Sequence, residues 1–398
     1  MEQHTFRRRG LGLRGVDEQR VSAGYVLYTP LTSRTAHLIS TSGEEVHRWT
    51  LPHRAGRHAR ILPNGNLAYN GAYPDSPNLF PMWKKYCGGV MMQVDSTGNI
   101  VRRYTDPHAH HDQNHLDDGT LLYTTLEPLT PEEAARVRGG IPGSEAPDGT
   151  VYADCIKHVD PWSVSTDSSS ADFEADGKGG AKLLWSWRAI DHLDFDKFPQ
   201  HQDYPREHWP LINSVSRDSE GNIIASSRNT SSVFVISCET GKVLWRLTAP
   251  VVNQQHCAHE INSRGDMLIL DNGVFRPGLA VPFSRAIIVS RTTKQITWEY
   301  KDRSTGGIGF FTPFMGSAQK LENGNVLIAE AATGRIIEVT EGGEVVWEFV
   351  VPQLNDYRRV MGERELEEME KIGFSYESNA IFRAYKYRLE DLPWLPRQ

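Results

Sequence analysis

The chain has 398 residues, of which 39% are hydrophobic and 23% are charged, and its net charge is −7. This is the composition of a globular protein with room for one large domain or two ordinary ones. The mildly acidic balance argues against nucleic acid or an anionic membrane as a partner. The four cysteines include no Cys-x-x-Cys pair, so they predict neither a zinc knuckle nor a disulfide framework.

The sequence predicts a cytoplasmic protein that does not enter the membrane. It has no apolar run long enough to cross a bilayer. Arg7, Arg8 and Arg9 are followed by no apolar segment of the kind that a signal peptide requires. We therefore expect residues 1–20 to form an N-terminal arm.

A short pattern recurs six times along the chain: a strand that follows a turn and ends on two side chains one residue apart, usually aromatic or apolar. The pairs are His47/Trp49, Arg102/Tyr104, Trp185/Trp187, Trp245/Leu247, Trp298/Tyr300 and Trp347/Phe349. We assign these aromatic side chains to packing between sheets. A second type of hairpin, with turns such as Asn64-Gly65 and Asp118-Gly119, lies between the copies. Two hairpins per unit, repeated about every 50 residues, predict an all-β, six-bladed β-propeller over residues 21–352.

Two segments depart from the repeat. The long spacing between Tyr104 and Trp187 predicts an insertion at about 127–180. In it, Thr130, Pro131 and Glu133 predict the capped start of a helix, and the Ser/Asp/Gly-rich residues 165–180 predict a loop. Residues 353–398 are expected to form a short C-terminal extension packed on the propeller. It would hold a charged helix over 363–372 and a strand or short helix over 379–387 that packs on the propeller or completes a blade.

Histidines occupy one position of the repeat, the strand that leads into the second hairpin. They are His58 before Asn64-Gly65, His108, His110, His111 and His115 before Asp118-Gly119, and His256 and His259 before Arg264-Gly265. Arg228 follows the matching hairpin of another blade. Because equivalent positions of different blades face one another around the axis, we expect these side chains in the central channel. Their repetition in three blades favours a functional site over unrelated surface residues.

Several motifs, in their order and spacing, resemble those of the arylsulfotransferase-like proteins from about residue 36 to residue 387. The motifs are His110-His111-Asp112, Ile212-Asn213-Ser214-Val215, Ser226-Ser227-Arg228-Asn229, Gln254-Gln255-His256, Leu270-Asp271-Asn272-Gly273, Ala318-Gln319-Lys320-Leu321-Glu322-Asn323-Gly324, and the closing segment NAIFRAYKY.

The resemblance implies a six-bladed propeller that moves a sulfuryl group between phenols without a cofactor. By motif, His256 would attack the sulfate ester and be transiently sulfated, while His111 and Arg228 would hold the sulfuryl oxygens. The expected partner is a small aromatic molecule. The residues expected to contact it are His110, His58, Asn213, His208 and His259. The aromatic residues of the long loops, Trp162, Phe195, Phe198 and Trp209, suit either the mouth of the pocket or packing.

One family position is changed. Where the family usually has a histidine in a W-T-H-x-N context, this chain has Leu211. The role expected of that histidine, which is to protonate or stabilise the phenolic oxygen, is vacant unless His208 fills it.

Two other functions remain open from the residues alone. In the first, a divalent metal bound by His111, His115, His256 and His259 assists a lyase, hydrolase or isomerase reaction, since imidazoles suit several transition metals. The i,i+3 spacing of His256 and His259 counts against a single ion on a regular strand. In the second, the propeller is a non-catalytic binding platform.

Overall fold

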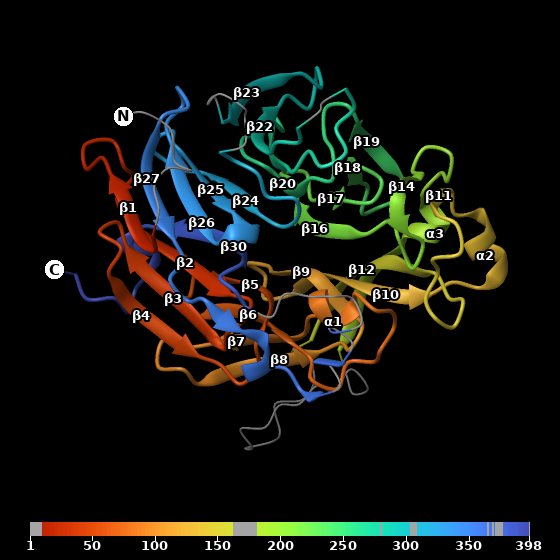
Figure 1. Cartoon of the computed structure of the whole chain (residues 1–398), viewed down its shortest axis with the longest axis horizontal. Helices are drawn as coiled ribbons and strands as arrows, with labels where there is room; N and C mark the ends of the chain where they lie inside the picture. The colour runs from red at the N-terminus through yellow and green to blue at the C-terminus, as the bar shows by residue number, and fades with distance from the viewer. Residues whose placement is uncertain are drawn as a thin grey trace.

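The computed structural model describes residues 10–161, 181–278, 281–302, 309–363, 366–367, 370 and 377–397. These residues form six mainly antiparallel sheets arranged around a central axis (Figure 1). The all-β, six-bladed propeller predicted from the repeat is therefore confirmed. None of the helices formed by the described residues is long and apolar enough to cross a membrane.

In each blade the strands run from the channel outward. The first blade is β30 (Ile381–Tyr387), β2 (Tyr25–Pro30), β3 (Thr35–Ser40) and β4 (Glu45–Thr50), and the second is β5 (Ala55–Ile61), β6 (Leu67–Ala72), β7 (Gly89–Val94) and β8 (Ile100–Thr105). The third is β9 (Ala109–His115), β10 (Leu121–Pro128), β12 (Tyr152–Asp160) and β13 (Lys182–Arg188), and the fourth is β16 (Ile212–Arg217), β17 (Ile223–Ser227), β18 (Ser232–Ile236) and β19 (Val243–Thr248). The fifth is β20 (His256–Glu260), β21 (Met267–Asp271), β22 (Arg285–Val289) and β23 (Ile296–Lys301), and the sixth is β24 (Ser317–Lys320), β25 (Val326–Glu330), β26 (Arg335–Val339) and β27 (Val345–Val350).

The remaining elements extend or connect the blades. Two strands extend blades: β1 (Gly12–Val16) lies outside β27, and β15 (His208–Trp209) pairs with β12. Two small sheets pair β11 (Gly139–Ile141) with β14 (Gln200–Pro205) and β28 (Asn355–Asp356) with β29 (Glu377–Ser378). The short helices are α1 (Trp83–Tyr86), α2 (Pro131–Arg136) and α3 (Ala189–His192), with 3-10 turns at Ala331–Thr333, Tyr357–Arg359 and Leu389–Asp391.

The C-terminal segment closes the ring. Strand β30 is the innermost strand of the first blade and pairs with β2, with Tyr387 opposite Tyr25 and Tyr385 opposite Leu27. The propeller thus continues beyond residue 352, where it was expected to end, and β30 is part of a blade rather than of an appended extension. Pairing the two ends of the chain in one sheet removes the open edges that an unclosed ring would leave. The helix expected over 363–372 falls largely on residues outside the described part of the chain.

The expected insertion over 127–180 is shorter than predicted, because it contains a blade strand. Strand β12 is the third strand of the third blade, and it pairs with both β10 and β13. The helix expected within the insertion is present as α2. Its capping box joins the Thr130 hydroxyl to the Glu133 amide, and the Glu133 carboxylate to the Thr130 amide. The expected loop over 165–180 lies outside the described residues.

The recurring aromatic residues tie each blade to the next. In five blades one indole N–H donates to a backbone carbonyl in a turn of the following blade, at 2.8 or 2.9 Å: Trp49 to Asp95, Trp187 to Gly241, Trp245 to Arg291, Trp298 to Glu341 and Trp347 to Thr41. In the second blade, where the pair ends in Tyr104, the phenol lies 3.1 Å from the phenol of Tyr123 in the third. The bond from Trp347 joins the sixth blade to the first.

Candidate functional site

A cavity of about 700 Å³ opens among the inner strands and the loops at one end of the channel. This volume suits a small organic ligand. Its polar lining is Arg57, Lys85, Tyr86, His111, Tyr204, Glu207, His208, Arg228, Asn229, His256, Tyr357, Glu377 and Ser378. Its apolar lining is Leu31, Met82, Pro205, Leu211, Phe314, Met315, Ala332, Ala380 and Phe382.

His256, at the start of β20, is held in one tautomer by its neighbours. The side-chain amide of Asn272 donates to the carbonyl oxygens of Thr312 (2.7 Å) and Met315 (2.9 Å), which leaves its Oδ1 as an acceptor. Nδ1 of His256 lies 2.7 Å from that Oδ1, so Nδ1 carries the proton and Nε2 carries the lone pair. The Nε2 lone pair accepts a 3.2 Å hydrogen bond from the Met315 amide. Burial, despite the hydrogen bond to Asn272, lowers the pKa of His256 to about 3, so the ring is neutral at physiological pH.

His111 faces the same cavity from β9. Its Nδ1 lies 2.9 Å from Nδ1 of His110, and its ring centroid is 4.7 Å from that of Tyr86. Burial, together with the charge of Arg57, holds the pKa of His111 well below its ordinary value. His111 and His256 are therefore both neutral.

Breaks in the register of four inner strands set the orientation of these side chains. Strands β5, β9, β16 and β20 each break register with their neighbour at this end of the channel. His111, Leu211 and Cys257 at or beside these breaks have φ values of 44°, 63° and 54°. Such bulges turn side chains out of regular alternation and are common beside active sites. The i,i+3 spacing of His256 and His259 spans one of them.

Three cationic residues line the cavity. Arg228 follows β17, and its guanidinium lies 4.5 Å from the centre of the Tyr204 ring, with its Nε 3.2 Å from the Tyr204 hydroxyl. Arg57, on β5, donates to the carbonyl oxygens of Gly56 (2.8 Å) and Lys85 (3.0 Å). Burial and the neighbouring arginines Arg57 and Arg228 lower the pKa of Lys85, next to Tyr86 in α1, to about 8. The cavity therefore suits an anionic group.

Glu207 is a cavity-lining acid whose charge is disfavoured. Its side chain is 9% exposed, and burial raises its pKa from 4.5 to about 7. At neutral pH a substantial share of these carboxyl groups holds a proton.

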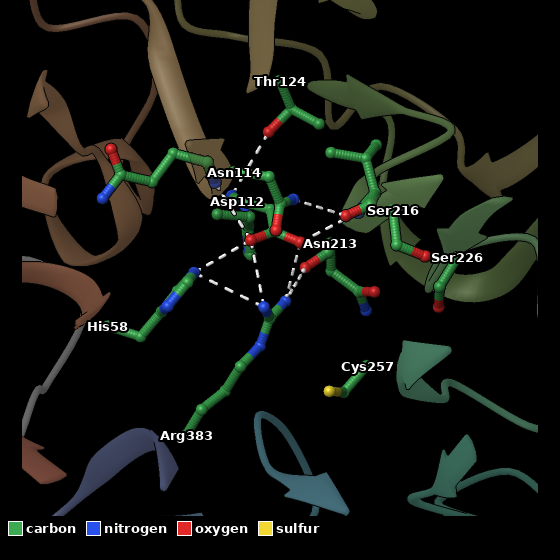
Figure 2. A network of polar contacts seen from close by, with 12 residues as sticks. His58, Asp112, Asn114, Thr124, Asn213, Ser216, Ser226, Cys257 and Arg383 are labelled. Carbon is green, nitrogen blue, oxygen red and sulfur yellow. Dashed lines mark hydrogen bonds and ion pairs between the residues drawn. The ribbon is translucent and has the colours of Figure 1, made fainter. Parts of the chain in front are cut away.

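A buried polar network lies next to the cavity (Figure 2). Asp112 accepts two hydrogen bonds from Arg383, at 3.0 and 2.9 Å, and lies 2.9 Å from Nε2 of His58. The Val215 amide also donates to it, at 2.8 Å. Burial alone would raise the pKa of Asp112, but Arg383 and His58 outweigh it and hold the pKa at about 2. The network ties β5, β9, β16 and β30 together and fixes the strands that carry the site.

A second buried group lies beside His111. Nε2 of His110 is 3.0 Å from Asp154 Oδ1, and Nε2 of His208 is 3.2 Å from Asp154 Oδ2. Of the residues that the structure describes, these three form the group whose potential metal-ligand atoms all lie within 4.8 Å of one another. Among those residues, His111, His115, His256 and His259 form no such group.

A family model described as arylsulfotransferase (ASST) matches residues 80–351, more than half of the chain. The chain belongs to the arylsulfotransferase family. The resemblance predicted from the motifs is thus confirmed, and membership supports a sulfotransferase-like function in general terms.

Solved structures of similar fold are distant from this chain in sequence. A protein of unknown function from Bacteroides caccae has a TM-score of 0.52 and 13% identity over 92% of this chain and 100% of its own. A streptogramin B lyase has a TM-score of 0.43 and 12% identity over 87% of this chain and 84% of its own. The first likeness concerns the fold alone. No curated protein matches the chain.

The residues that the sequence predicted for the site fall into three groups. His256, His111, Arg228 and His208 line the cavity. His110, His58 and Asn213 are buried next to it, where they make polar contacts with Asp154, Asp112 and the Gln255 carbonyl respectively. His259 and His115 lie further along the inner strands β20 and β9, with ring nitrogens at 3.0 Å from the Cys257 carbonyl and 3.1 Å from the Gln93 amide.

Several cavity residues were missed from the sequence. Arg57 could have been predicted, because it directly precedes His58 on the strand that leads into the second hairpin of its blade. Lys85, Tyr86 and Glu207 lie in connecting segments, where no repeat indicates orientation. Of the loop aromatics, Phe198 and Trp209 are buried in the core and Phe195 packs against it, while Trp162 lies outside the described residues. Tyr204 and His208 of the same loop line the cavity instead.

Proposed function

We propose that the protein transfers a sulfuryl group from an aryl sulfate to a phenolic acceptor, with His256 as the nucleophile. One observation carries the proposal: a neutral imidazole with its lone pair on Nε2 lies in a cavity that also contains three cationic side chains. Tyr86, Tyr204, Phe314 and Phe382 in the same lining suit an aromatic ring.

In the first half-reaction, Nε2 of His256 donates its lone pair to sulfur while the bond from sulfur to the phenolic oxygen breaks. The oxygen leaves with that electron pair, and the sulfuryl group is held on Nε2. Because Nε2 accepts a hydrogen bond from the Met315 amide, that bond must break as the substrate binds. In the second half-reaction, an acceptor phenol forms the new sulfur–oxygen bond, and the lone pair returns to Nε2.

Charge in the transition state lies on the sulfuryl and leaving oxygens, as it does in phosphoryl transfer. Arg228 is suited to hold the sulfuryl oxygens with its planar set of donors. His111 and Lys85 provide further donors in the same cavity. Asn272 keeps the proton of His256 on Nδ1, so that Nε2 remains available.

Glu207 is suited to move the proton. Its raised pKa of about 7 lets it protonate the departing phenolate and then accept a proton from the incoming phenol. In this way Glu207 takes the role that the family histidine would have at the place of Leu211.

A chromogenic aryl sulfate, assayed with a phenolic acceptor, tests the proposal. We expect His256→Ala to lower kcat by at least about 10³-fold, because it removes the nucleophile. His259→Ala is the matched control, since His259 lies on the same strand outside the cavity lining, and its rate should stay near that of the wild type. An unchanged kcat in His256→Ala would contradict the proposal.

A further inference from the structure

Two histidines and one aspartate converge in the wall behind the cavity. His110 belongs to β9, Asp154 to β12 and His208 to β15, which pairs with β12. All three are buried, with exposed fractions of 0%, 0% and 2%. The rings of His110 and His208 are nearly perpendicular, at 89°, and their Nε2 atoms lie nearest to different oxygens of the carboxylate.

The distances in this group do not correspond to well-formed hydrogen bonds. Nε2 of His110, Oδ1 of Asp154 and Nε2 of His208 are buried, and among the described residues each is without a hydrogen-bond partner of suitable geometry. Yet Nε2 and the carboxylate oxygens lie only 3.0 and 3.2 Å apart. A ring nitrogen points its donor or lone pair along one axis, so these axes are poorly aligned with the nearest oxygen. Burying three polar atoms without hydrogen bonds lowers the stability of the folded protein.

We propose that His110, Asp154 and His208 bind a divalent transition-metal ion, for which Zn²⁺ is the best-suited probe. Two imidazoles and one carboxylate are a common donor set for zinc, with three protein ligands and one open position. Metal–ligand bonds of about 2.0–2.1 Å in tetrahedral geometry place ligand atoms about 3.3 Å apart. The 3.0 Å between His110 Nε2 and Asp154 Oδ1 is close to this value, and one ligand atom from each of the three residues lies within 4.8 Å of the others. An ion among the three would satisfy every orphaned atom at once.

Contacts around the group support this assignment. Ligating histidines usually have their second ring nitrogen held by another group. Nδ1 of His208 lies 3.1 Å from the Tyr86 hydroxyl, and Nδ1 of His110 lies 2.9 Å from Nδ1 of His111. The second carboxylate oxygen of Asp154 accepts a 3.0 Å hydrogen bond from the Ile212 amide, which orients the carboxylate.

These contacts would also connect the bound ion to His111, which lines the cavity. With a metal on Nε2, His110 keeps its proton on Nδ1 and donates it to His111, whose own proton is then on Nε2. His208, one of the three proposed ligands, also lines the cavity. The site does not depend on the proposed sulfuryl transfer, because its ligands differ from the nucleophile and from Arg228.

Direct metal binding tests the site. Full-length protein without a histidine tag, stripped with a chelator, is titrated with Zn²⁺ by calorimetry and with Co²⁺ by visible absorption. We expect one ion per chain and the ligand-field bands of four-coordinate Co²⁺. Asp154→Asn retains the size of the side chain and the acceptor for the Ile212 amide but loses the charge. It should weaken Zn²⁺ binding by about 100-fold or more, and His208→Ala should do the same.

His115→Ala is the control, because His115 is a buried channel histidine outside the group, and its affinity for Zn²⁺ should match that of the wild type. Circular dichroism reports whether each variant folds, and His208→Ala decides the matter if Asp154→Asn does not. Wild-type protein that binds Zn²⁺ no more tightly than the folded ligand variants would overturn the proposal. So would four-coordinate Co²⁺ bands that persist in them.

Discussion

Leu211, which by the motif resemblance stands at the place of a family histidine, is held in an uncommon backbone conformation. Its φ is 63°, and its side chain lines the cavity. A β-carbon with a bulky apolar side chain is unfavourable in the left-handed region, where histidine, asparagine and aspartate are several-fold enriched. The position therefore suits the histidine that the family usually has.

Leu211→His should add a second proton donor, in addition to Glu207, without destabilising the fold. We expect at least about a tenfold rise in turnover of aryl sulfates with poor leaving groups, which need protonation most. The midpoint of thermal unfolding should stay the same or rise, because histidine tolerates the positive φ. Leu211→Ala is the control for space alone. Equal rates in the two variants would show that the gain has nothing to do with the imidazole.

Glu207 makes both stability and activity depend on pH. Between its ordinary pKa of 4.5 and its folded value of about 7, the folded protein holds a proton that the unfolded chain has lost. Stability is therefore lost as the pH rises through this window, by on the order of 3 kcal/mol. Glu207→Gln should remove this loss in denaturant unfolding measured at several pH values. It should also remove the decline of kcat/KM above about pH 7 that is expected of a general acid.

At the scale of elements, the recurring Trp residues explain the repeat. An outer-strand indole donates to the next blade in five of the six blades, and Tyr104 contacts the next blade in the second, so the pattern in the sequence records the contacts between blades. The Arg383–Asp112 ion pair likewise joins two blades, because it connects the inner strands β30 and β9. Breaking a fully buried pair of this kind leaves an uncompensated charge, so β30 contributes both pairing and electrostatics to the ring.

Trp347→Phe should destabilise the protein where the ring closes. It removes the 2.8 Å bond to the Thr41 carbonyl and leaves a small void around a side chain that is 0% exposed. We expect a loss of about 2–3 kcal/mol in the free energy of unfolding. Trp298→Phe is the matched control, because it loses the same kind of bond, to the Glu341 carbonyl, from a half-buried position. A larger loss for Trp298→Phe would contradict this account.

At the scale of the whole molecule, ring closure concentrates positive charge in one cavity although the chain is acidic overall. Arg57, Lys85 and Arg228 come from β5, α1 and the turn after β17, and no local segment contains two of the three. Their mutual repulsion inside a partly desolvated space is relieved by an anion.

Inorganic sulfate should therefore bind and stabilise the protein. We expect a saturable rise in the midpoint of thermal unfolding that is larger than that caused by chloride at the same ionic strength. Sulfate also stabilises proteins by exclusion from their surfaces, so Arg228→Gln is needed as the reference for that general effect. The saturable part should shrink in Arg228→Gln, and in the wild type above about pH 8, where Lys85 loses its proton. A response that is linear in sulfate in both proteins would contradict a specific site.

The sequence by itself determined the class of fold, the number of blades and the family. These depend on turns, strand periodicity and short motifs, which are local and repeat with the chain. It also indicated His256, His111 and Arg228, because equivalent repeat positions converge on one axis. Only the tertiary structure decided which of two neighbouring residues lines the cavity. At each bulge, alternation fails: Arg57 and His111 line the cavity, while His58 and Asp112 lie buried beside it. It also decided that β30 closes the first blade and that Lys85 and Glu207 join the site. These depend on pairings between distant segments and on desolvation, which no local pattern records.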